Sequence, residues 1–170
     1  MSPWGITLRG MPVALRQGPD QMEGSVMKVS SILKSKGAAV ATTTPSAMLN
    51  SVVWELRVQG IGALVVSEDG ATVLGVISER DIVRGLAEHG ARLLGMRVSE
   101  LMTQSAVTCT PEDSVTRVMT EMTRHRARHL PVVEDGKLRG IISIGDVVKH
   151  RLDELELEAN VLREAYLVRH

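Results

Sequence analysis

Serine and aspartate recur at one spacing in two short stretches of the chain, GVISERD at Gly75–Asp81 and GIISIGD at Gly140–Asp146. Each stretch follows an apolar run and opens an expected helix. A carboxylate held at a helix start can accept two hydrogen bonds from a vicinal diol, such as that of ribose. The helix N-terminus beside it favours phosphate, because unpaired N–H groups and the helix dipole both point there. The two stretches therefore supply four candidate ligand-binding residues, Ser78, Asp81, Ser143 and Asp146.

The same residues also fit a purely structural role. A serine followed three residues later by an acid resembles a helix capping box, in which both side chains satisfy N–H groups of the first turn. Capping boxes favour Glu or Gln, whose longer side chains reach back to the N-cap amide, whereas both copies here carry Asp. Serine could serve both roles at once. A ligand clamp and a helix cap therefore stay open as alternatives.

The motif pair belongs to a longer internal repeat. Three further pairs of segments match: Val29–Leu33 with Val98–Met102, Ala39–Pro45 with Ala106–Pro111, and Gly62–Gly70 with His129–Gly136. In each half a short strand ends at Thr-Pro, because proline moves its predecessor out of the helical region. An amphipathic helix follows, then two short apolar strands separated by EDG, a hairpin turn signal. We expect strands at Ala63–Val66, Val73–Ile77, Leu130–Val133 and Leu138–Ile142.

These segments resemble a tandem pair of CBS domains, the regulatory modules named after cystathionine β-synthase. The resemblance covers about Val29 to Lys149 and is carried by the two Gly-x-x-Ser-x-x-Asp motifs with their matching elements. It implies an α/β fold of two β-α-β-β-α repeats related by a pseudo-two-fold axis. The domains we expect are a loose N-terminal extension at 1–26, repeat 1 at 27–92, repeat 2 at 93–150 and a C-terminal helical extension at 151–170.

The resemblance further implies binding of an adenosine nucleotide, with the motif aspartate on the ribose hydroxyls, in clefts that combine both repeats. One cleft would join Ser143 and Asp146 to residues of the first repeat, namely Gly37, Ala38, Ile61, Gly62 and Ala63. The other would join Ser78 and Asp81 to residues of the second repeat, namely Thr103, Ala106, His129 and Leu130. Small residues would let main-chain groups approach a flat purine.

A basic run, RHRARHLP at Arg124–Pro131, precedes the second repeat's apolar strand. One interpretation is a solvated charged face. The other is that Arg128 and His129 contact phosphate, as residues at this position do in the family. Arg80, inside the first motif, is another phosphate candidate, but the second copy has Gly145 in its place. The two clefts are therefore predicted to differ in affinity.

Composition argues against several other functions. Basic and acidic residues number 20 each and aromatic residues make up 2%, so neither a basic patch nor stacking platforms for nucleic acid are expected. No apolar run is long enough to span a bilayer. Cys109 is the only cysteine, which excludes an internal disulfide, predicts a small buried side chain and fits the reducing cytoplasm.

The sequence shows no sign of catalysis. It lacks a catalytic triad, a set of metal ligands at the required spacing, a P-loop and a dinucleotide-binding fingerprint, so we predict that the protein is not an enzyme. The Gly- and Pro-rich residues 1–26 lack the unbroken apolar centre of a secretory signal. They are read as a loose extension, with Met22 and Met27 as alternative starts.

The C-terminal stretch predicts one long helix from about Ile144. Its apolar residues alternate spacings of four and three, which is a heptad stripe: Val148, Leu152, Leu155, Ala159, Leu162 and Tyr166. The stripe could pack back along the same chain. We favour pairing with a second subunit, because such a helix is longer than one small module can cover, and because family members dimerise through their helices.

Taken with the resemblance, these features predict a cytoplasmic, homodimeric regulatory module without a catalytic cofactor. It would bind AMP, ADP, ATP or NAD(H) between its repeats and signal energy or redox state to an unknown effector protein, without contacting nucleic acid or membrane. A phosphate-binding arginine slightly favours nucleotides over the positively charged S-adenosylmethionine. The alternative is a structural dimerisation module whose ligand clefts are vestigial.

Overall fold

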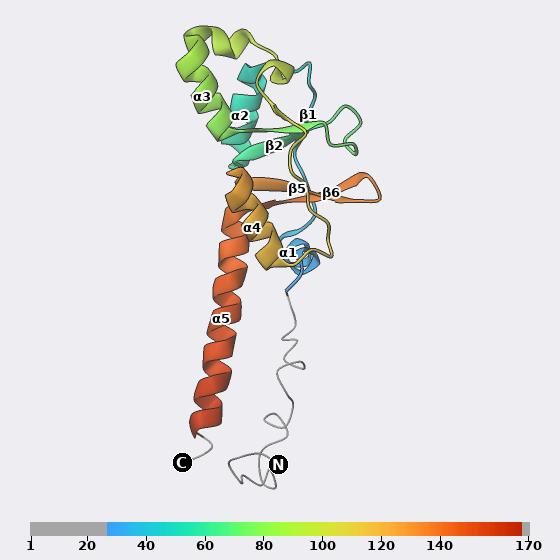
Figure 1. Ribbon diagram of the computed structural model, residues 1–170. Coiled ribbons are helices and arrows are strands. Elements are labelled where there is room, and N and C mark those ends of the chain that lie inside the picture. The colour runs from blue at the N-terminus through green and yellow to red at the C-terminus, as the bar shows by residue number, and fades with distance from the viewer. Residues whose placement is uncertain (1–26, 168–170) are drawn as a thin grey trace.

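The computed structural model describes residues 27–167, so the predicted extension at 1–26 and residues 168–170 lie outside the described part. Two small α/β units are stacked one above the other, and one long helix runs away from them (Figure 1). The elements in chain order are α1 Val29–Lys36, β1 Thr42–Thr43, α2 Leu49–Gln59, β2 Ala63–Val66, β3 Gly75–Ser78, α3 Glu79–His89, the 3₁₀ helices η3 Gly90–Gly95 and η4 Val98–Glu100, β4 Thr103–Gln104, α4 Val115–His125, β5 His129–Glu134, β6 Lys137–Ser143 and α5 Ile144–Leu167. This confirms the predicted α/β class and the long C-terminal helix.

The two sheets are unequal. The first has the order β1-β2-β3-β4, in which β1 pairs parallel with β2 and the other neighbours pair antiparallel. The second is the antiparallel hairpin β5-β6, which Cys109 joins through a single parallel bridge to Val132. The strand expected at Ala106–Pro111 is therefore wrong in extent, because only one residue of it forms a bridge.

The two EDG turns also differ. Asp135 and Gly136 both have positive φ, 52° and 72°, which gives the tight turn that matches the twist of a two-residue hairpin. In the first repeat the carboxylate of Asp69 accepts hydrogen bonds from the amides of Ala71 (2.8 Å) and Thr72 (2.7 Å) and so holds a longer loop. Strand β3 consequently begins at Gly75, two residues later than expected.

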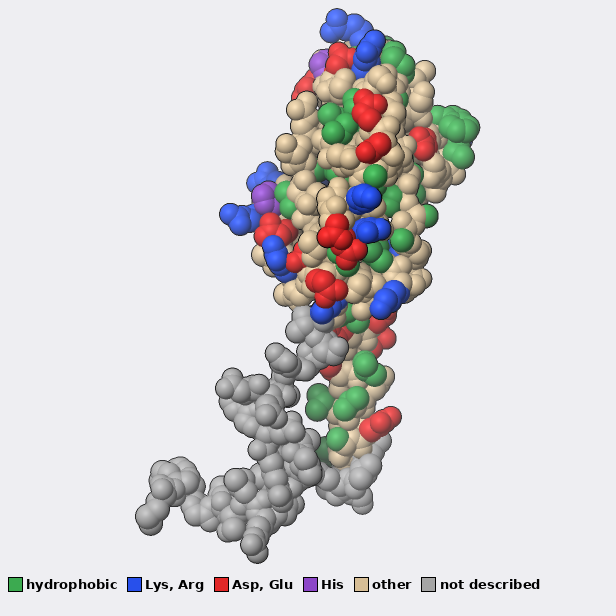
Figure 2. Space-filling view, turned by 90° about the vertical axis from the view of Figure 1, so that its right-hand side faces the viewer, with side chains coloured by type: hydrophobic (Ala, Val, Ile, Leu, Met, Phe, Trp, Pro, Cys, Tyr) green, Lys and Arg blue, Asp and Glu red, His purple; other side chains and the backbone are tan. Residues whose placement is uncertain are grey.

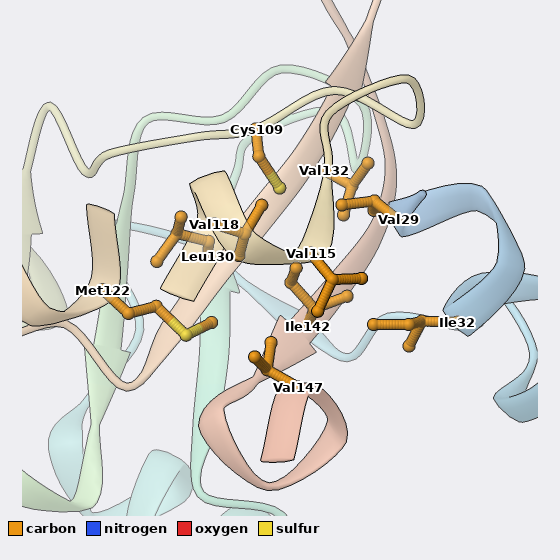
Figure 3. Close-up of a cluster of buried hydrophobic side chains, with 10 residues drawn as sticks. All are labelled: Val29, Ile32, Cys109, Val115, Val118, Met122, Leu130, Val132, Ile142 and Val147. Carbon is orange, nitrogen blue, oxygen red and sulfur yellow. The ribbon is translucent and has the colours of Figure 1, made fainter. Parts of the chain in front are cut away.

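Each sheet covers its own hydrophobic core. Each core also includes residues from the start of the other repeat. Val29 and Ile32 of α1 are fully buried in the core of the second repeat (Figure 3). Leu93 and Val98, at the start of the second half, are buried in the core of the first repeat. Each packed unit therefore includes a segment that belongs to the other repeat in the sequence.

Matching backbone hydrogen bonds hold this exchange in place. In the second repeat's core they run from Val29 N to Asp113 O, from Ser30 N to Pro111 O and from Val115 N to Met27 O, each 2.9 Å long. In the first repeat's core they run from Val98 N to Ala47 O, from Ser99 N to Pro45 O and from Leu49 N to Met96 O, also each 2.9 Å long. The same three contacts made in both directions are what a pseudo-two-fold relation between the repeats requires.

The exchange explains why each repeated motif begins with glycine. A Cβ added to Gly75 would lie 2.5 Å from the carbonyl oxygen of Thr103, and one added to Gly140 would lie 2.6 Å from Cδ2 of Leu33. Thr103 and Leu33 both belong to segments that cross over from the other repeat. A side chain at Gly75 would therefore push the crossing backbone away, and one at Gly140 would displace the side chain of Leu33.

Helix α5 is the element least covered by the rest of the molecule. Its 24 residues span about 36 Å at 1.5 Å per residue, and only its first part lies against the body (Figure 1). No helix within residues 27–167 combines the length and apolar character of a membrane span.

We predict that Gly75→Ala destabilises the protein by about 1–3 kcal/mol, the usual cost of forcing extra atoms into a packed site. The added Cβ would meet the Thr103 backbone, which cannot rotate away as a side-chain end can. Gly95→Ala is the matched control, because a Cβ there meets no atom within 4 Å. Urea unfolding monitored by circular dichroism measures both, and equal stability of the two variants would contradict the crossing-segment explanation.

Candidate functional site

Each Ser/Asp motif ends a strand and begins a helix. Strand β3 runs into α3 at Ser78, and β6 runs into α5 at Ser143. Oδ2 of Asp81 accepts hydrogen bonds from the backbone N of Ser78 (2.9 Å) and from its hydroxyl (2.6 Å). Oδ2 of Asp146 accepts the same two bonds from Ser143, at 2.7 and 2.8 Å. Both motifs therefore cap their helices.

Aspartate completes the capping box in both copies, although Glu and Gln are the more usual residues at this position. Each carboxylate reaches the N-cap amide, because the serine lies in extended backbone that turns its N–H toward the first helical turn. The cap leaves part of each carboxylate available, however. Among the described residues all the hydrogen bonds to Asp81 and Asp146 fall on Oδ2, so Oδ1 can still accept from a ligand hydroxyl.

The carboxylate of Asp146 contacts the end of α1, a helix from the first half of the sequence that packs on the second repeat's core. Nζ of Lys36, at the end of α1, lies 2.6 Å from Oδ2 of Asp146. Gly37 follows directly with a φ of 91° and ends the helix, and Ala38 comes next, both exposed. Burial acts to raise the pKa of Asp146, but the hydrogen bonds from Lys36 and Ser143 outweigh it and hold that pKa below its usual range. Asp146 is thus a carboxylate at neutral pH.

His129 lies where the two repeats touch. Its ring atoms Cε1 and Nε2 are 3.0 and 3.1 Å from where a Cβ on Gly62 would be, so the imidazole packs closely against this glycine. The sequence assigned His129 to the Asp81 cleft and Gly62 to the Asp146 cleft, but the structure places the two residues together. Burial, with the nearby charge of Lys36, holds the pKa of His129 below its usual value despite the opposing effect of Asp146 and Glu79.

The surroundings of Asp81 differ from those of Asp146. Nη1 of Arg80 donates to the carbonyl oxygen of Arg126 at 2.9 Å, which brings the first motif against the end of α4 in the second repeat. Arg80 is therefore engaged in joining the repeats. Thr103 is exposed and pairs with Val76 at the edge of the first sheet, and Ala106 is half-buried further along the same crossing segment.

Several predicted ligand residues have side chains that point elsewhere. Leu130 is fully buried in the second core and Ala63 is 6% exposed, so only their backbone groups could face a ligand. Ile61 packs against the first core. Arg128 is exposed and its carbonyl oxygen accepts a hydrogen bond from Ile144 N, which ties the start of α5 to the residue before β5.

Two charged residues near the clefts, Lys36 and Glu79, were not predicted. Lys36 lies three residues beyond the matching segment Val29–Leu33, so the repeat pattern predicts no role for it. Glu79 is one of the variable motif positions, and its Oε2 lies 3.6 Å from where a Cβ on Gly62 would be. A cation reaching a motif aspartate from another repeat cannot be read from spacing alone.

The described residues offer little for other chemistry. No group of three or more His, Cys, Asp or Glu side chains within residues 27–167 is placed to hold a metal ion. Burial raises the pKa of the Cys109 thiol to about 12, so it is a protonated core side chain, which confirms the prediction for that residue. The surroundings of Asp81 and Asp146, predicted from the sequence to line ligand clefts, are the candidate binding sites.

Comparison with known proteins agrees with this fold. The CBS domain profile matches residues 29–88 and 98–153. The mitochondrial CBS domain-containing protein CBSX3 of Arabidopsis thaliana is 34% identical over 142 residues, which cover 77% of this chain and 69% of that protein. The crystal structure of the CBS-domain containing protein ATU1752 from Agrobacterium tumefaciens is 43% identical, with a TM-score of 0.71 over 74% of this chain and 99% of that one. The chain therefore belongs to the CBS domain family, and it carries two such domains in tandem.

A second solved structure shares the fold at lower identity. The CBS domain pair of protein MJ0100, in complex with 5′-methylthioadenosine and S-adenosyl-L-methionine, is 22% identical with a TM-score of 0.65. The match covers 72% of this chain and 98% of that one. Tandem CBS domains, as predicted from the two motifs, are thus confirmed by both sequence and structure.

The position of His129 predicts a pH-dependent stability. Because its pKa is lower in the folded state than its ordinary 6.5, the unfolded chain takes up a proton first as the pH falls. The stability that neutral His129 contributes is complete above pH 6.5 and declines as the pH falls below it. Urea unfolding between pH 7.5 and 5 should show wild type losing stability relative to His129→Gln. His89→Gln, at the end of α3, controls for loss of a histidine, and parallel curves for wild type and His129→Gln would contradict the prediction.

Proposed function

We propose that the protein is a non-enzymatic regulatory module that binds an adenosine-containing ligand, AMP, ADP, ATP or NAD(H), between its CBS domains. The observation that carries the proposal is the geometry of Asp81 and Asp146. Each carboxylate is fixed by its helix cap through Oδ2, while Oδ1 accepts no hydrogen bond from the described residues. A fixed acceptor beside a helix N-terminus suits a ribose diol with a phosphate attached.

The ligand class also has support from the fold. A CBS pair of the same architecture was crystallised with two adenosine compounds, 5′-methylthioadenosine and S-adenosyl-L-methionine. Of the small residues expected to flank a purine, Gly37 follows Lys36, whose Nζ contacts Asp146, and Gly62 lies against the ring of His129. A planar base next to a glycine can reach main-chain groups that a larger side chain would cover.

Regulation would follow from linkage. A ligand that contacts both repeats favours the arrangement of the repeats that it binds better, and the shift is limited by its differential affinity for the two arrangements. The module would thereby report energy or redox state to an effector protein. We place this action in the cytoplasm, where unpaired Cys109 stays reduced. The rival function, a dimerisation module with vestigial clefts, predicts no ligand response.

Binding should raise the melting temperature, because a ligand at 100 times its Kd stabilises the folded state by about 2.7 kcal/mol. Asp81→Asn and Asp146→Asn keep an acceptor for the helix cap but lose a charge-assisted diol contact, which costs about 1.5–3 kcal/mol, or roughly 10- to 150-fold in affinity. Calorimetric titration with AMP, ADP, ATP, NADH, 5′-methylthioadenosine and S-adenosylmethionine measures this. Asp153→Asn, exposed on α5, is the control for charge.

Two outcomes would support the rival. One is the absence of any thermal shift or heat of binding with the whole panel at millimolar concentration. The other is unchanged affinity in Asp81→Asn and Asp146→Asn together with lower stability, since the aspartates would then be helix caps only.

We further propose that the protein is a homodimer joined through α5. The side chains of the heptad stripe are exposed within one chain: Leu152 is 55%, Leu155 44% and Leu162 71% exposed. Hydrophobic side chains, interspersed with acidic ones, lie along the part of α5 that extends below the body (Figure 2). A long helix with such a stripe gains most of its stability by packing the apolar face against a partner.

Charges beside the stripe favour a second copy in parallel orientation. In a parallel two-stranded coiled coil, a g position of one helix faces the following e position of the other. With Leu152 and Leu155 at a and d, this sets Arg151 against Glu156 and Glu158 against Arg163 of the second copy, which are pairs of opposite charge. In an antiparallel pairing centred on Glu156, that carboxylate would instead face Glu156 of the second copy, which carries the same charge.

Replacing both Leu155 and Leu162 with Glu should convert the dimer into a folded monomer, because unpaired charges in a helix seam are strongly unfavourable. Light scattering gives the mass and circular dichroism the fold. Leu157→Glu, the same change at an exposed residue outside the stripe, should leave the dimer intact. A monomeric wild type or an unchanged double variant would rule out this seam, and complete unfolding would mean that α5 packs within its own chain.

A further inference from the structure

The strongest unassigned interaction near the clefts is the ion pair of Lys36 with Asp146. Lys36 is the last residue of α1, whose Val29 and Ile32 are anchored in the second repeat's core. Its Nζ lies 2.6 Å from Oδ2 of Asp146, and the two side chains are 31% and 24% exposed. The fold therefore holds an ammonium group directly at the carboxylate that is proposed to bind ribose.

The other cleft has no equivalent cation. The side chain of Leu33 lies close to Gly140, and that of Met102 lies close to Gly75. Leu33 and Met102 therefore correspond, at a separation of 69 residues. Pro45 and Pro111, however, correspond at a separation of 66 residues. The second repeat is thus three residues shorter between these points, and Lys36 lies in the stretch that is shortened.

The partners of the two aspartates reflect this difference. Within residues 27–167 the hydrogen bonds to Asp81 come from Ser78 alone, whereas Asp146 accepts from both Ser143 and Lys36. Arg80, the basic residue nearest Asp81 in sequence, donates to the carbonyl of Arg126. The Asp146 cleft is therefore the more positive of the two beside its carboxylate.

We propose that Lys36 makes the Asp146 cleft selective for adenosine ligands that carry a phosphate next to the ribose, and this rests on the proposed function above. In a nucleotide whose ribose diol binds Asp146, the 5′-phosphate is attached to the same sugar. The flexible four-carbon side chain of Lys36 can reach that phosphate by rotating. The ammonium group has three donors and can turn toward the phosphate while the backbone of α1 stays fixed. A partly exposed ion pair contributes little to stability, so exchanging the carboxylate for the phosphate costs little.

The same group would act against other adenosine compounds. Uncharged adenosine would bind Oδ1 of Asp146 and offer the ammonium group of Lys36 no phosphate to bind. The sulfonium of S-adenosylmethionine would place a like charge near Lys36, which is unfavourable at short range. The Asp81 cleft lacks this discrimination and should accept uncharged adenosine ligands as readily as nucleotides.

Calorimetric titration of the full chain with AMP and with adenosine tests the proposal. Wild type should bind AMP more tightly than adenosine. Lys36→Met keeps the apolar stem and removes the charge, so it should weaken AMP binding by about tenfold or more and leave adenosine binding unchanged or stronger. Lys36→Arg should retain the preference for AMP. Lys34→Met removes one charge from an exposed position of the same helix and should behave as wild type.

The results separate this proposal from the proposed function. Binding of neither AMP nor adenosine to wild type would overturn both. Equal affinity of wild type for the two compounds, or equal weakening of both in Lys36→Met, would overturn the role of Lys36 alone. Thermal unfolding without ligand verifies that Lys36→Met is folded, and Lys36→Arg decides the case if that variant is not.

Discussion

Everything in this molecule depends on the exchange of segments between the two CBS domains. Neither core is closed by its own repeat, because Val29 and Ile32 complete one and Leu93 and Val98 complete the other. Fully burying one such aliphatic side chain contributes about 1.5–3 kcal/mol, and a whole domain is stable by only about 5–15 kcal/mol. The two repeats must therefore fold as one unit, with the clefts between them fixed by the same contacts.

This constraint gives the repeated motif its form. The glycine admits the segment that crosses from the other repeat, and the serine and aspartate start the helix that follows. Capping and binding are compatible because the cap uses one carboxylate oxygen. The motif is thus required twice for folding, and the proposed ligand clefts are a second use of groups that the fold has already fixed in place.

The local part of the fold could be read from the sequence, and the long-range part could not. Strand β2 spans Ala63–Val66 as predicted, because a short apolar run before a turn is a local signal. The exchange of α1 and the loss of most of the strand before Pro111 depend on hydrogen bonds between residues far apart in sequence. For the same reason the sequence placed the predicted ligand residues His129 and Gly62 in separate clefts although they lie together, and it gave no role to Lys36.

The position of Asp146 suggests how the proposed ligand site and the proposed dimer would communicate. Asp146 is in the first turn of α5, and the heptad stripe begins two residues later at Val148. A ligand that draws Lys36 away from Asp146 changes the charge at the start of the helix whose other end would form the subunit seam. Coupling between the two sites then has to be reciprocal, so a dimer that fixes α5 would change ligand affinity by the same factor as ligand changes dimerisation. Asp81 caps α3, which ends at His89 far from that seam, so the two clefts would differ in what they control as well as in what they bind.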